Sequence, residues 1–379
     1  MPNQRPPAWL CAVIAALLFT LALTACQAPA APTTPSTPTA ASQPQAQADP
    51  QPEAVADPEA KTEATAPSGD ARLVIYSGRS ENLLAPLIEQ FRQQTGLDVQ
   101  VRYGGTSELA ATIMEEGNKS PADVYFAQDA GALGALAAAG RLVKLPDELL
   151  KQVEPRFHDD NGSWIGTSGR ARVIVYNTNQ FKESDLPASI WDFTDPKWKG
   201  KLGWAPTNGS FQAFITALRL LEGEDKARQW LEAMVANEIK SYPNNDAITE
   251  AVSAGEIEAG FVNHYYVLEI GSSHPDDFHA AVHHLTAGDA GSMVNVASAG
   301  ILNTARHPQE AHKFLDFLLS TEAQTYFATK TWEYPLIAGV AADPSLVTLK
   351  DIKAPQIDLS DLKDLSGTLH LLQDVGALD

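Results

Sequence analysis

Short apolar segments alternate with amphipathic segments in the chain that follows residue 70. An apolar run at 73–76 precedes apolar residues at helical spacing, namely Leu83, Leu84, Leu87, Ile88 and Phe91. Gly96 is expected to end this helix, and alternation at 99–101 begins a second strand. This order limits the chain to an α/β fold, because each strand and helix must bury its apolar side against a neighbouring element.

The same order continues over the next segment. Ser107 is expected to cap a second helix that runs to Met114, and residues 123–127 read as a third strand. In mostly parallel sheets of this kind, ligands bind at the carboxyl ends of the strands. The turns after the first and third strands are therefore candidate cleft residues, and they contain Arg79, Ser80 and Gln128.

A second group of elements repeats this logic. Residues 173–176 read as a strand that returns from the first group, and 203–204 read as a strand that leads into a turn and a helix at 211–221. A turn of this kind at a helix N-terminus can bind an anion through free backbone N–H groups. Alternatively, a turn residue simply caps the helix. The turn residues are Asn208, Gly209 and Ser210.

Two further segments extend the second group. Residues 244–246, which include Asn245, are expected to open another helix in the same way. Residues 257–262 read as a strand that ends in Asn263, His264, Tyr265 and Tyr266.

Length and charge set further limits. Residues 71–379 are too many for a typical single domain and suit two lobes. The formal net charge of the whole chain is −20. This sign argues against nucleic acid as a partner, because nucleic-acid binding needs a basic surface. It is compatible with the attraction of cations, although solubility explains it equally well.

The N-terminal residues indicate export. Arg5 precedes an apolar run from Ala8 to Leu23, which is shorter than the about 20 residues of a membrane-spanning helix. The run ends at Cys26 in a segment that resembles the lipobox of bacterial lipoproteins. We therefore expect residues 1–26 to be a lipoprotein signal peptide. Lipidation of Cys26 would anchor the protein to the outer face of the cytoplasmic membrane. An uncleaved anchor helix is the alternative, and it also leaves the bulk of the chain outside the cytoplasm.

Residues 27–70 have the composition of a tether. Nine of the 25 prolines of the chain lie between Pro29 and Pro67, and this segment has no aromatic residue. It cannot bury enough apolar area to offset the entropy of ordering, so we expect a disordered linker. Its coil dimensions give a reach of roughly 35–40 Å. Cleavage would remove Cys11 and lipidation would occupy Cys26, so no cysteine would remain for a disulfide, a zinc site or a nucleophile.

Six short motifs occur in register with one protein family. They are Tyr76-Ser77-Gly78-Arg79, Glu115-Glu116-Gly117-x-x-Ser120-Pro121-Ala122-Asp123, Ser168-Gly169-Arg170-x-Arg172, Pro206-Thr207-Asn208-Gly209-Ser210-Phe211, Asn263-His264-Tyr265-Tyr266 and Glu333-Tyr334-Pro335-Leu336. Together they resemble the bacterial ferric-iron-binding periplasmic proteins, the receptors of iron(III) ABC importers, over essentially all of 71–379. The resemblance implies a type II two-lobed periplasmic-binding-protein fold, with mixed sheets flanked by helices and Fe(III) bound between the lobes. It also implies delivery to an ABC transporter permease in the cytoplasmic membrane, and we expect a monomer.

The resemblance assigns the metal to Tyr265 and Tyr266. Fe(III) is small and highly charged, so it prefers anionic oxygen ligands. A bound cation can remove the phenol proton, whose pKa is ordinarily near 10. Adjacent residues of a straight strand point to opposite faces, so both can meet one metal only at a strand end or a helix start. In other contexts a Tyr–Tyr pair most often packs in a core.

Other positions depart from the family pattern. Some members add a histidine and a glutamate where this chain has Ser80 and Gln128, and others place a third tyrosine where it has Asn208. The resemblance therefore implies that a small anion, such as carbonate or phosphate, completes the metal shell. Arg79 would neutralise excess negative charge, or it is an ordinary surface cation.

Several further residues are candidates for binding the anion or supporting the metal ligands. Arg170 matches a family arginine near the cleft, and a structural ion pair would explain it equally well. The full set is Arg79, Ser80, Gln128, Arg170, Asn208, Gly209, Ser210, Asn245 and Asn263.

Histidines offer a second candidate metal site. His279, His283 and His284 cluster in the sequence, and the first two have the i,i+4 spacing of a helix. Zinc sites on that spacing recruit ligands from defined positions, and no H-E-x-x-H pattern is present. Solvated or capping histidines are therefore expected. His264 is either a metal ligand or a donor beside the tyrosines.

Two rival functions can be compared with iron binding. We do not expect an enzyme, because the sequence contains no G-x-S-x-G motif, phosphate-binding P-loop or dinucleotide glycine motif. A binding protein of similar fold for a small anion or organic solute is the stronger alternative. Its donors would be Arg79, Asn208, Ser210 and Asn263.

Overall fold

Residues 72–378 are described by the structure, which is a computed structural model. The expected signal peptide at 1–26, the expected linker at 27–70 and the lipidation candidate Cys26 lie outside this described part. Within residues 72–378, no helix has the length and apolar character that crossing a membrane requires.

The first three strands form a parallel group, as the sequence predicts. β1 (Arg72–Ser77) pairs in parallel with β2 (Asp98–Tyr103) on one side and with β3 (Val124–Ala127) on the other. α1 (Glu81–Thr95) and α2 (Thr106–Glu116) connect the strands, and α1 buries its predicted apolar face. The carboxyl ends of the three strands therefore meet at one edge of the sheet.

The start of α2 differs from the prediction that Ser107 caps it. The helix begins at Thr106, and Gly105 occupies the N-cap position without a side-chain hydrogen bond. Thr106 Oγ1 donates to the carbonyl oxygen of Gly78 at 3.3 Å, and Ser107 Oγ donates to Gln212 of the second lobe. Contacts with distant residues thus use both hydroxyls that local capping would need.

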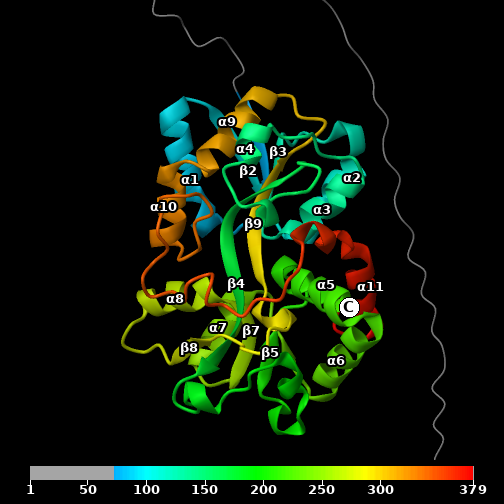
Figure 1. Cartoon of the computed structure of the whole chain (residues 1–379), viewed down its shortest axis with the longest axis vertical. Helices are drawn as coiled ribbons and strands as arrows, with labels where there is room; N and C mark the ends of the chain where they lie inside the picture. The colour runs from blue at the N-terminus through cyan, green and yellow to red at the C-terminus, as the bar shows by residue number, and fades with distance from the viewer. Residues whose placement is uncertain (1–71, 379) are drawn as a thin grey trace, which may run out of the picture. The chain divides into compact units, whose positions relative to one another are not determined.

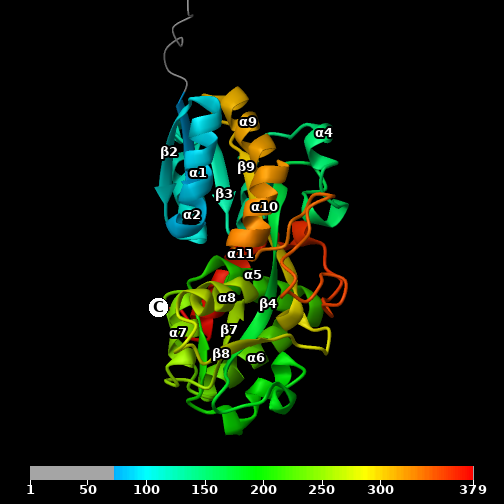
Figure 2. The same ribbon diagram turned by 90° about the vertical axis from the view of Figure 1, so that its left-hand side faces the viewer.

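Two long strands connect the first lobe, which contains β1 to β3, with the second lobe, which contains β5 (Leu202–Trp204) to β8 (Ala280–His283) (Figure 1). β4 (Ile165–Asn177) contains 13 residues, all of them buried. Its first half pairs antiparallel with β9 (Val294–Ile301), and its second half pairs antiparallel with β7 (Ala259–Asn263) and β8 (Ala280–His283). Figures 1 and 2 show β4 and β9 running from one half of the molecule to the other. The strand predicted at 173–176 is therefore the last part of a strand that both lobes share.

The sheet of the second lobe is mixed. β5 (Leu202–Trp204) pairs in parallel with β6 (Lys240–Ser241) and with β7, whereas β4 and β7 are antiparallel. The strand order through both lobes is β2-β1-β3-β9-β4-β7-β5-β6, with β8 beside β4. The strand predicted at 257–262 begins two residues later, at Ala259. This is the two-lobed α/β arrangement that the sequence predicts.

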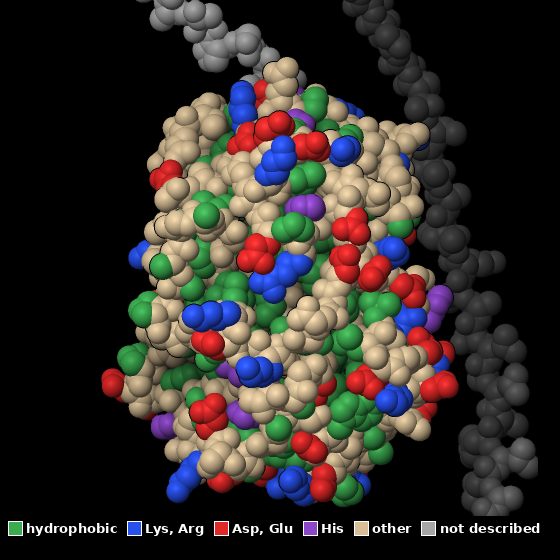
Figure 3. Space-filling model, in the orientation of Figure 1, with side chains coloured by type: hydrophobic (Ala, Val, Ile, Leu, Met, Phe, Trp, Pro, Cys, Tyr) green, Lys and Arg blue, Asp and Glu red, His purple; other side chains and the backbone are tan. Residues whose placement is uncertain are grey.

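Helices pack around both lobes (Figures 1 and 2). Phe214 and Trp230 meet in the second-lobe core at an angle of 90°, with ring centroids 5.5 Å apart. Figure 3 shows acidic and basic side chains scattered over the visible face. The helices after α2 are α3 (Ala130–Ala138), α4 (Asp147–Leu150), α5 (Gly209–Glu222), α6 (Glu224–Ala236), α7 (Asn245–Ser253), α8 (His264–Ser273), α9 (Pro308–Leu318), α10 (Thr321–Lys330) and α11 (Leu365–Asp374).

Candidate metal centre

Tyr265 and Tyr266 lie in the first turn of α8, immediately after β7 ends at Asn263. Adjacent side chains diverge along a strand, but the turn into the helix brings these rings together. Their centroids are 4.2 Å apart, and their planes are inclined by 32°. Both rings are buried, and Leu83 of α1 packs against them. The pair therefore occupies the strand end at which the sequence places it.

Gln128 brings the two phenol groups to one point. Its Nε2 donates to Tyr266 Oη at 2.8 Å and to Tyr265 Oη at 3.3 Å. Two oxygens within hydrogen-bond distance of the same nitrogen can also approach one small cation. Gln128 follows β3 in the first lobe, and its Oε1 accepts a hydrogen bond from Asn208 Nδ2 at 3.3 Å. The Gln128 amide thus connects the two lobes at the tyrosines.

Arg79 is not the surface cation that the sequence left as an alternative. Its guanidinium is buried, and Nη2 donates to Glu333 Oε2 at 2.7 Å. It lies 5.8 Å from the centroid of the Tyr265 ring. Burial lowers the pKa of Arg79, but Glu333 and the two tyrosines raise that pKa by more, so the guanidinium stays charged. Nη1 is buried and has no hydrogen-bond partner among the described residues.

Glu333 belongs to a motif in the sequence, but its role becomes visible only in the fold. Its carboxylate is fully buried. Oε1 accepts from Ser168 Oγ at 2.9 Å, and Oε2 accepts from Thr331 Oγ1 at 2.9 Å as well as from Arg79. A carboxylate with these partners balances the charge of Arg79 and is not free for a metal.

The turn at Asn208, Gly209 and Ser210 caps a helix. Asn208 Oδ1 accepts hydrogen bonds from the Ser210 backbone N at 3.0 Å and from the Ser210 hydroxyl at 2.6 Å. The structure therefore shows the capping alternative, and the Ser210 N–H is not free for an anion. Gly209 faces the first lobe, where an added Cβ would lie 2.6 Å from Asp129 Oδ2. A side chain at this position would hold the lobes apart.

Three other predicted residues have buried donors without partners. Asn245 and Asn263 are buried, and neither Nδ2 has a hydrogen-bond partner among the described residues. Arg170 donates from Nη2 to the Val296 carbonyl oxygen at 3.3 Å, while its Nε and Nη1 have no partner in residues 72–378. That range also contains no ion pair of Arg170 that would explain it structurally. Buried donors of this kind are normally satisfied by water or a ligand.

The buried guanidinium groups of Arg170 and Arg172 concentrate positive charge near these donors. Burial raises the pKa of Asp129 to about 6, although the Arg170 charge opposes this shift. Burial and Arg170 lower the pKa of Arg172 to about 9, and its guanidinium lies 5.4 Å and 5.3 Å from the ring centroids of Phe211 and Phe214. Buried arginines near the tyrosines create a field that favours an anion.

His264 is not free to bind a metal. Its Nδ1 accepts a hydrogen bond from the Ala171 backbone N at 3.2 Å, and its Nε2 donates to the Trp332 carbonyl oxygen at 2.7 Å. Burial lowers the pKa of His264 to about 3, so the ring is neutral. Both ring nitrogens are hydrogen-bonded to backbone atoms, so the ring fixes the turn that precedes the tyrosines.

The clustered histidines do not form a helical metal site. His283 lies in strand β8 and His279 immediately precedes that strand, so helical spacing does not apply to them. His279 is exposed, as expected, but His283 is buried and donates from Nε2 to the Pro187 carbonyl oxygen at 2.7 Å. Across residues 72–378, no group of three or more His, Cys, Asp or Glu side chains could hold a metal ion.

A cavity of about 500 Å³ lies beside Tyr266. Residues of both lobes line it, including Arg79 and Gln128 from the first lobe and Asn208 from the second. Ser80 is exposed in its wall, at the N-cap of α1, and makes no side-chain capping bond. The cavity therefore joins the turns that the sequence predicts to form a cleft.

Two acidic residues in this wall were missed by the sequence analysis. Glu108 contributes from the first lobe and Asp246 from the second. Burial raises the pKa of Asp246, whose charge in turn helps to raise the pKa of Tyr266. A carboxylate oxygen is a ligand that hard cations accept. An acidic residue in the first turn of a helix also compensates the helix dipole, so its position alone could not reveal this location.

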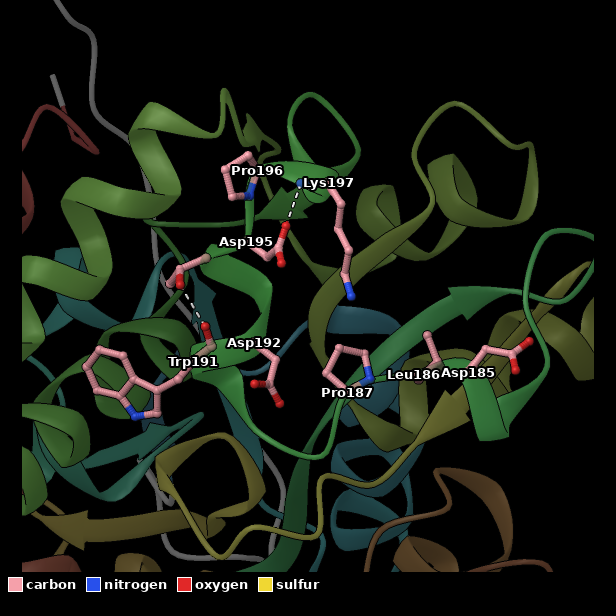
Figure 4. Close-up of a pocket in the computed structure, with 9 residues that line it drawn as sticks. Asp185, Leu186, Pro187, Trp191, Asp192, Asp195, Pro196 and Lys197 are labelled. Carbon is pink, nitrogen blue, oxygen red and sulfur yellow. Dashed lines mark hydrogen bonds between the residues drawn. The ribbon is translucent and has the colours of Figure 1, made fainter.

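A second depression of about 570 Å³ lies away from the tyrosines. Figure 4 shows Asp185, Asp192 and Asp195 around it together with Lys197, and the three carboxylates point in different directions. All three are exposed, and Asp195 Oδ1 accepts from the Lys197 backbone N at 2.9 Å. Carboxylates that do not converge cannot coordinate one cation together.

A cavity between two α/β lobes that share a strand is the architecture of a two-lobed solute-binding protein. Residues 73–332 match the family model of the bacterial extracellular solute-binding proteins. A Serratia marcescens Fe(3+)-binding periplasmic protein is 33% identical over 317 residues, which cover 83% of this chain and 93% of that protein.

Solved structures agree with this match. Iron-bound HitA from Pseudomonas aeruginosa has a TM-score of 0.77 and 36% identity, covering 81% of this chain and all of that one. A Trichodesmium protein in complex with iron and citrate has a TM-score of 0.68 and 30% identity, covering 80% and 99%. The chain belongs to the family of bacterial ferric-iron-binding periplasmic proteins, and the expected type II two-lobed fold is confirmed.

Proposed function

We propose that this protein captures Fe(III) between its lobes, with the phenolates of Tyr265 and Tyr266 as ligands. The observation that carries the proposal is the convergence of both phenol oxygens on Gln128 Nε2, at 3.3 Å and 2.8 Å. A metal ion at this convergence point would contact both oxygens. Gln128 would then turn from a bridge between phenols into a donor beside the metal.

A small anion, such as carbonate or phosphate, would complete the metal shell. The Arg79 charge is already balanced by Glu333. Two phenolates therefore leave one positive charge of Fe(III) without compensation. Buried donors without partners support an anion beside the tyrosines, and they lie on Arg79, Arg170, Asn245 and Asn263.

Export and membrane anchoring complete the proposal. The signal segment at 1–26 would be removed, Cys26 would carry lipid, and the linker at 27–70 would hold the 71–379 domain outside the cytoplasmic membrane. The domain would act as a monomer that delivers iron to an ABC transporter permease. The Serratia relative is named a periplasmic protein, which supports export of this chain.

One experiment separates iron binding from its alternative. Metal analysis of the purified protein, paired with its absorption spectrum after addition of Fe(III), should show bound iron and a visible phenolate-to-iron band. A protein that instead binds a small anion or organic solute would stay colourless. The cavity of about 500 Å³ exceeds the space of one ion, so it favours iron accompanied by an anion or small carboxylate over bare iron.

A further inference from the structure

A pocket of about 410 Å³ on the first lobe gathers positive charge away from the cleft. Arg72 and Arg102 reach it from β1 and β2, and Arg306 and His307 reach it from the turn before α9. Its lining contains no Asp or Glu, although the whole chain has a net charge of −20. None of its residues lines the cavity beside Tyr266.

A fully buried carboxylate fixes this basic pocket. Asp123 Oδ1 accepts from the backbone N atoms of Arg306 at 2.7 Å and His307 at 3.0 Å. Asp123 Oδ2 accepts from the Val74 backbone N at 2.9 Å and lies 3.1 Å from His307 Nδ1. The turn that carries Arg306 is thereby held against β1. Asp123 ends the motif at 115–123, which does not contribute to the cleft.

Two arginines of the basic pocket, Arg72 and Arg306, keep side-chain donors that no described residue satisfies. Arg72 Nε is buried without a partner among the described residues, and Arg72 Nη2 donates to Gln100. The Arg306 side chain makes no ion pair or hydrogen bond within residues 72–378. Arg102 Nη1 donates to Tyr76 Oη at 3.3 Å and lies 3.6 Å from Glu116, which is the one described carboxylate within ion-pair distance of these three arginines. Three arginines thus face two nearby carboxylates, Glu116 beside Arg102 and Asp123 beside His307, so the pocket keeps an excess of positive charge.

We propose that the basic pocket binds a phosphate group, and that the group belongs to the head group of an anionic phospholipid. One guanidinium can donate to two phosphate oxygens at once. The three guanidinium groups of this pocket, on Arg72, Arg102 and Arg306, come from separate segments of the chain. The volume exceeds that of a lone phosphate and leaves room for an esterified alcohol. Arg72 lies two positions after the end of the expected tether at 27–70, and anionic lipids attract arginines near a membrane.

Hydrogen–deuterium exchange of the full chain tests this site and separates two sources of phosphate. One arm adds inorganic phosphate to protein in neutral detergent, with chloride at equal ionic strength as the reference. The other arm compares vesicles of phosphatidylcholine alone with vesicles that also contain phosphatidylglycerol. Backbone exchange at 98–102 and 304–308 should slow by about tenfold when a charge-assisted contact forms there.

The double variant Arg102→Gln with Arg306→Gln should lose this protection. The matched control, Arg156→Gln with Arg228→Gln, removes two exposed arginines elsewhere and should keep it. Thermal unfolding midpoints of both should match the wild type. Protection by the mixed vesicles supports the lipid head group, whereas protection by inorganic phosphate alone keeps the phosphate site but overturns the lipid as its source. No protection in either arm, or equal protection in the double variant, overturns the proposal.

Discussion

Gln128 Nε2 donates to Tyr266 Oη at 2.8 Å, and this hydrogen bond joins the first lobe to the second. The same amide accepts a hydrogen bond from Asn208, so the Gln128 side chain both donates and accepts a hydrogen bond across the cleft. A contact that exists only in the closed arrangement stabilises closure. We expect iron and its accompanying anion to add to this effect, because Arg79 and Gln128 of the first lobe would contact the anion or the phenolates only in the closed arrangement.

Gln128→Ala should therefore shift the iron-free protein towards an open arrangement. Each neutral hydrogen bond contributes about 1 kcal/mol, which is enough to change the population of a nearly balanced equilibrium. Small-angle scattering should give a larger radius of gyration for the iron-free variant than for the wild type. Gln152→Ala, which changes an exposed glutamine of the first lobe, is the control and should leave the radius unchanged. Identical profiles for all three proteins would show that Gln128 does not hold the lobes together.

Tyr265→Phe and Tyr266→Phe test the metal ligands. Each change removes one anionic oxygen and keeps the ring, so packing is nearly preserved and a loss of affinity reports coordination. We expect either variant to lose several orders of magnitude in iron affinity, together with the visible band. Tyr176→Phe is the matched control, because this buried tyrosine makes no side-chain hydrogen bond within the described part of the chain. Two single variants with wild-type affinity and spectrum would place the iron elsewhere.

Iron affinity should fall as the pH falls. Burial, with help from Tyr265 and Asp246, raises the pKa of Tyr266 well above its ordinary value, so protons hold this oxygen strongly when no metal is bound. Protons and Fe(III) compete for the same phenolate, and each proton released costs about a factor of ten in affinity per pH unit of acidification. Competition titrations at several pH values should show this slope. Affinity that is constant with pH would argue against phenolate ligands.

Glu333→Gln should strongly destabilise the fold. It removes the partner of a buried guanidinium, and breaking such a pair costs about 3–5 kcal/mol. Asp364→Asn is the comparison, because Asp364 is 54% exposed where it pairs with Arg219, and an ion pair with one exposed partner contributes about 0–1 kcal/mol. Denaturant unfolding of both variants gives the two free energies. Equal losses would mean that the Arg79–Glu333 pair does not depend on its burial.

Cys26→Ser tests the proposed anchor. If Cys26 carries lipid, the variant should move from the membrane fraction to the soluble exported fraction. Immunoblots of separated fractions measure this directly, with the wild type as the reference. Continued membrane association of the variant would contradict the lipobox interpretation.

Local patterns predicted much of the fold. The strand at 73–76, the helix face from Leu83 to Phe91 and the stop at Gly96 depend on neighbours in the sequence, and all appear in the structure. The predicted cap at Ser107 failed because its hydroxyl is bonded to Gln212, which is 105 positions away. Propensity cannot anticipate a contact of this kind.

The family motif allowed the positions of the tyrosines to be predicted, because it marks a backbone turn. The contacts between charged residues of the site were less predictable. The position of Tyr265 and Tyr266 follows from the end of a strand. The burial of Arg79 depends on Glu333, which lies 254 positions along the chain. Asp246 joins the cavity only because the lobes face each other. Contacts across such separations are set by tertiary packing, so a single sequence does not reveal them.

Because the two lobes share the thirteen-residue strand β4, we expect them to unfold together on heating. All of its residues are buried, and it hydrogen-bonds to β9 along its first half and to β7 and β8 along its second half. Neither lobe can lose its sheet without exposing part of the backbone on which the other depends. Calorimetry should therefore record a single melting transition for residues 72–378, with calorimetric and van't Hoff enthalpies in agreement.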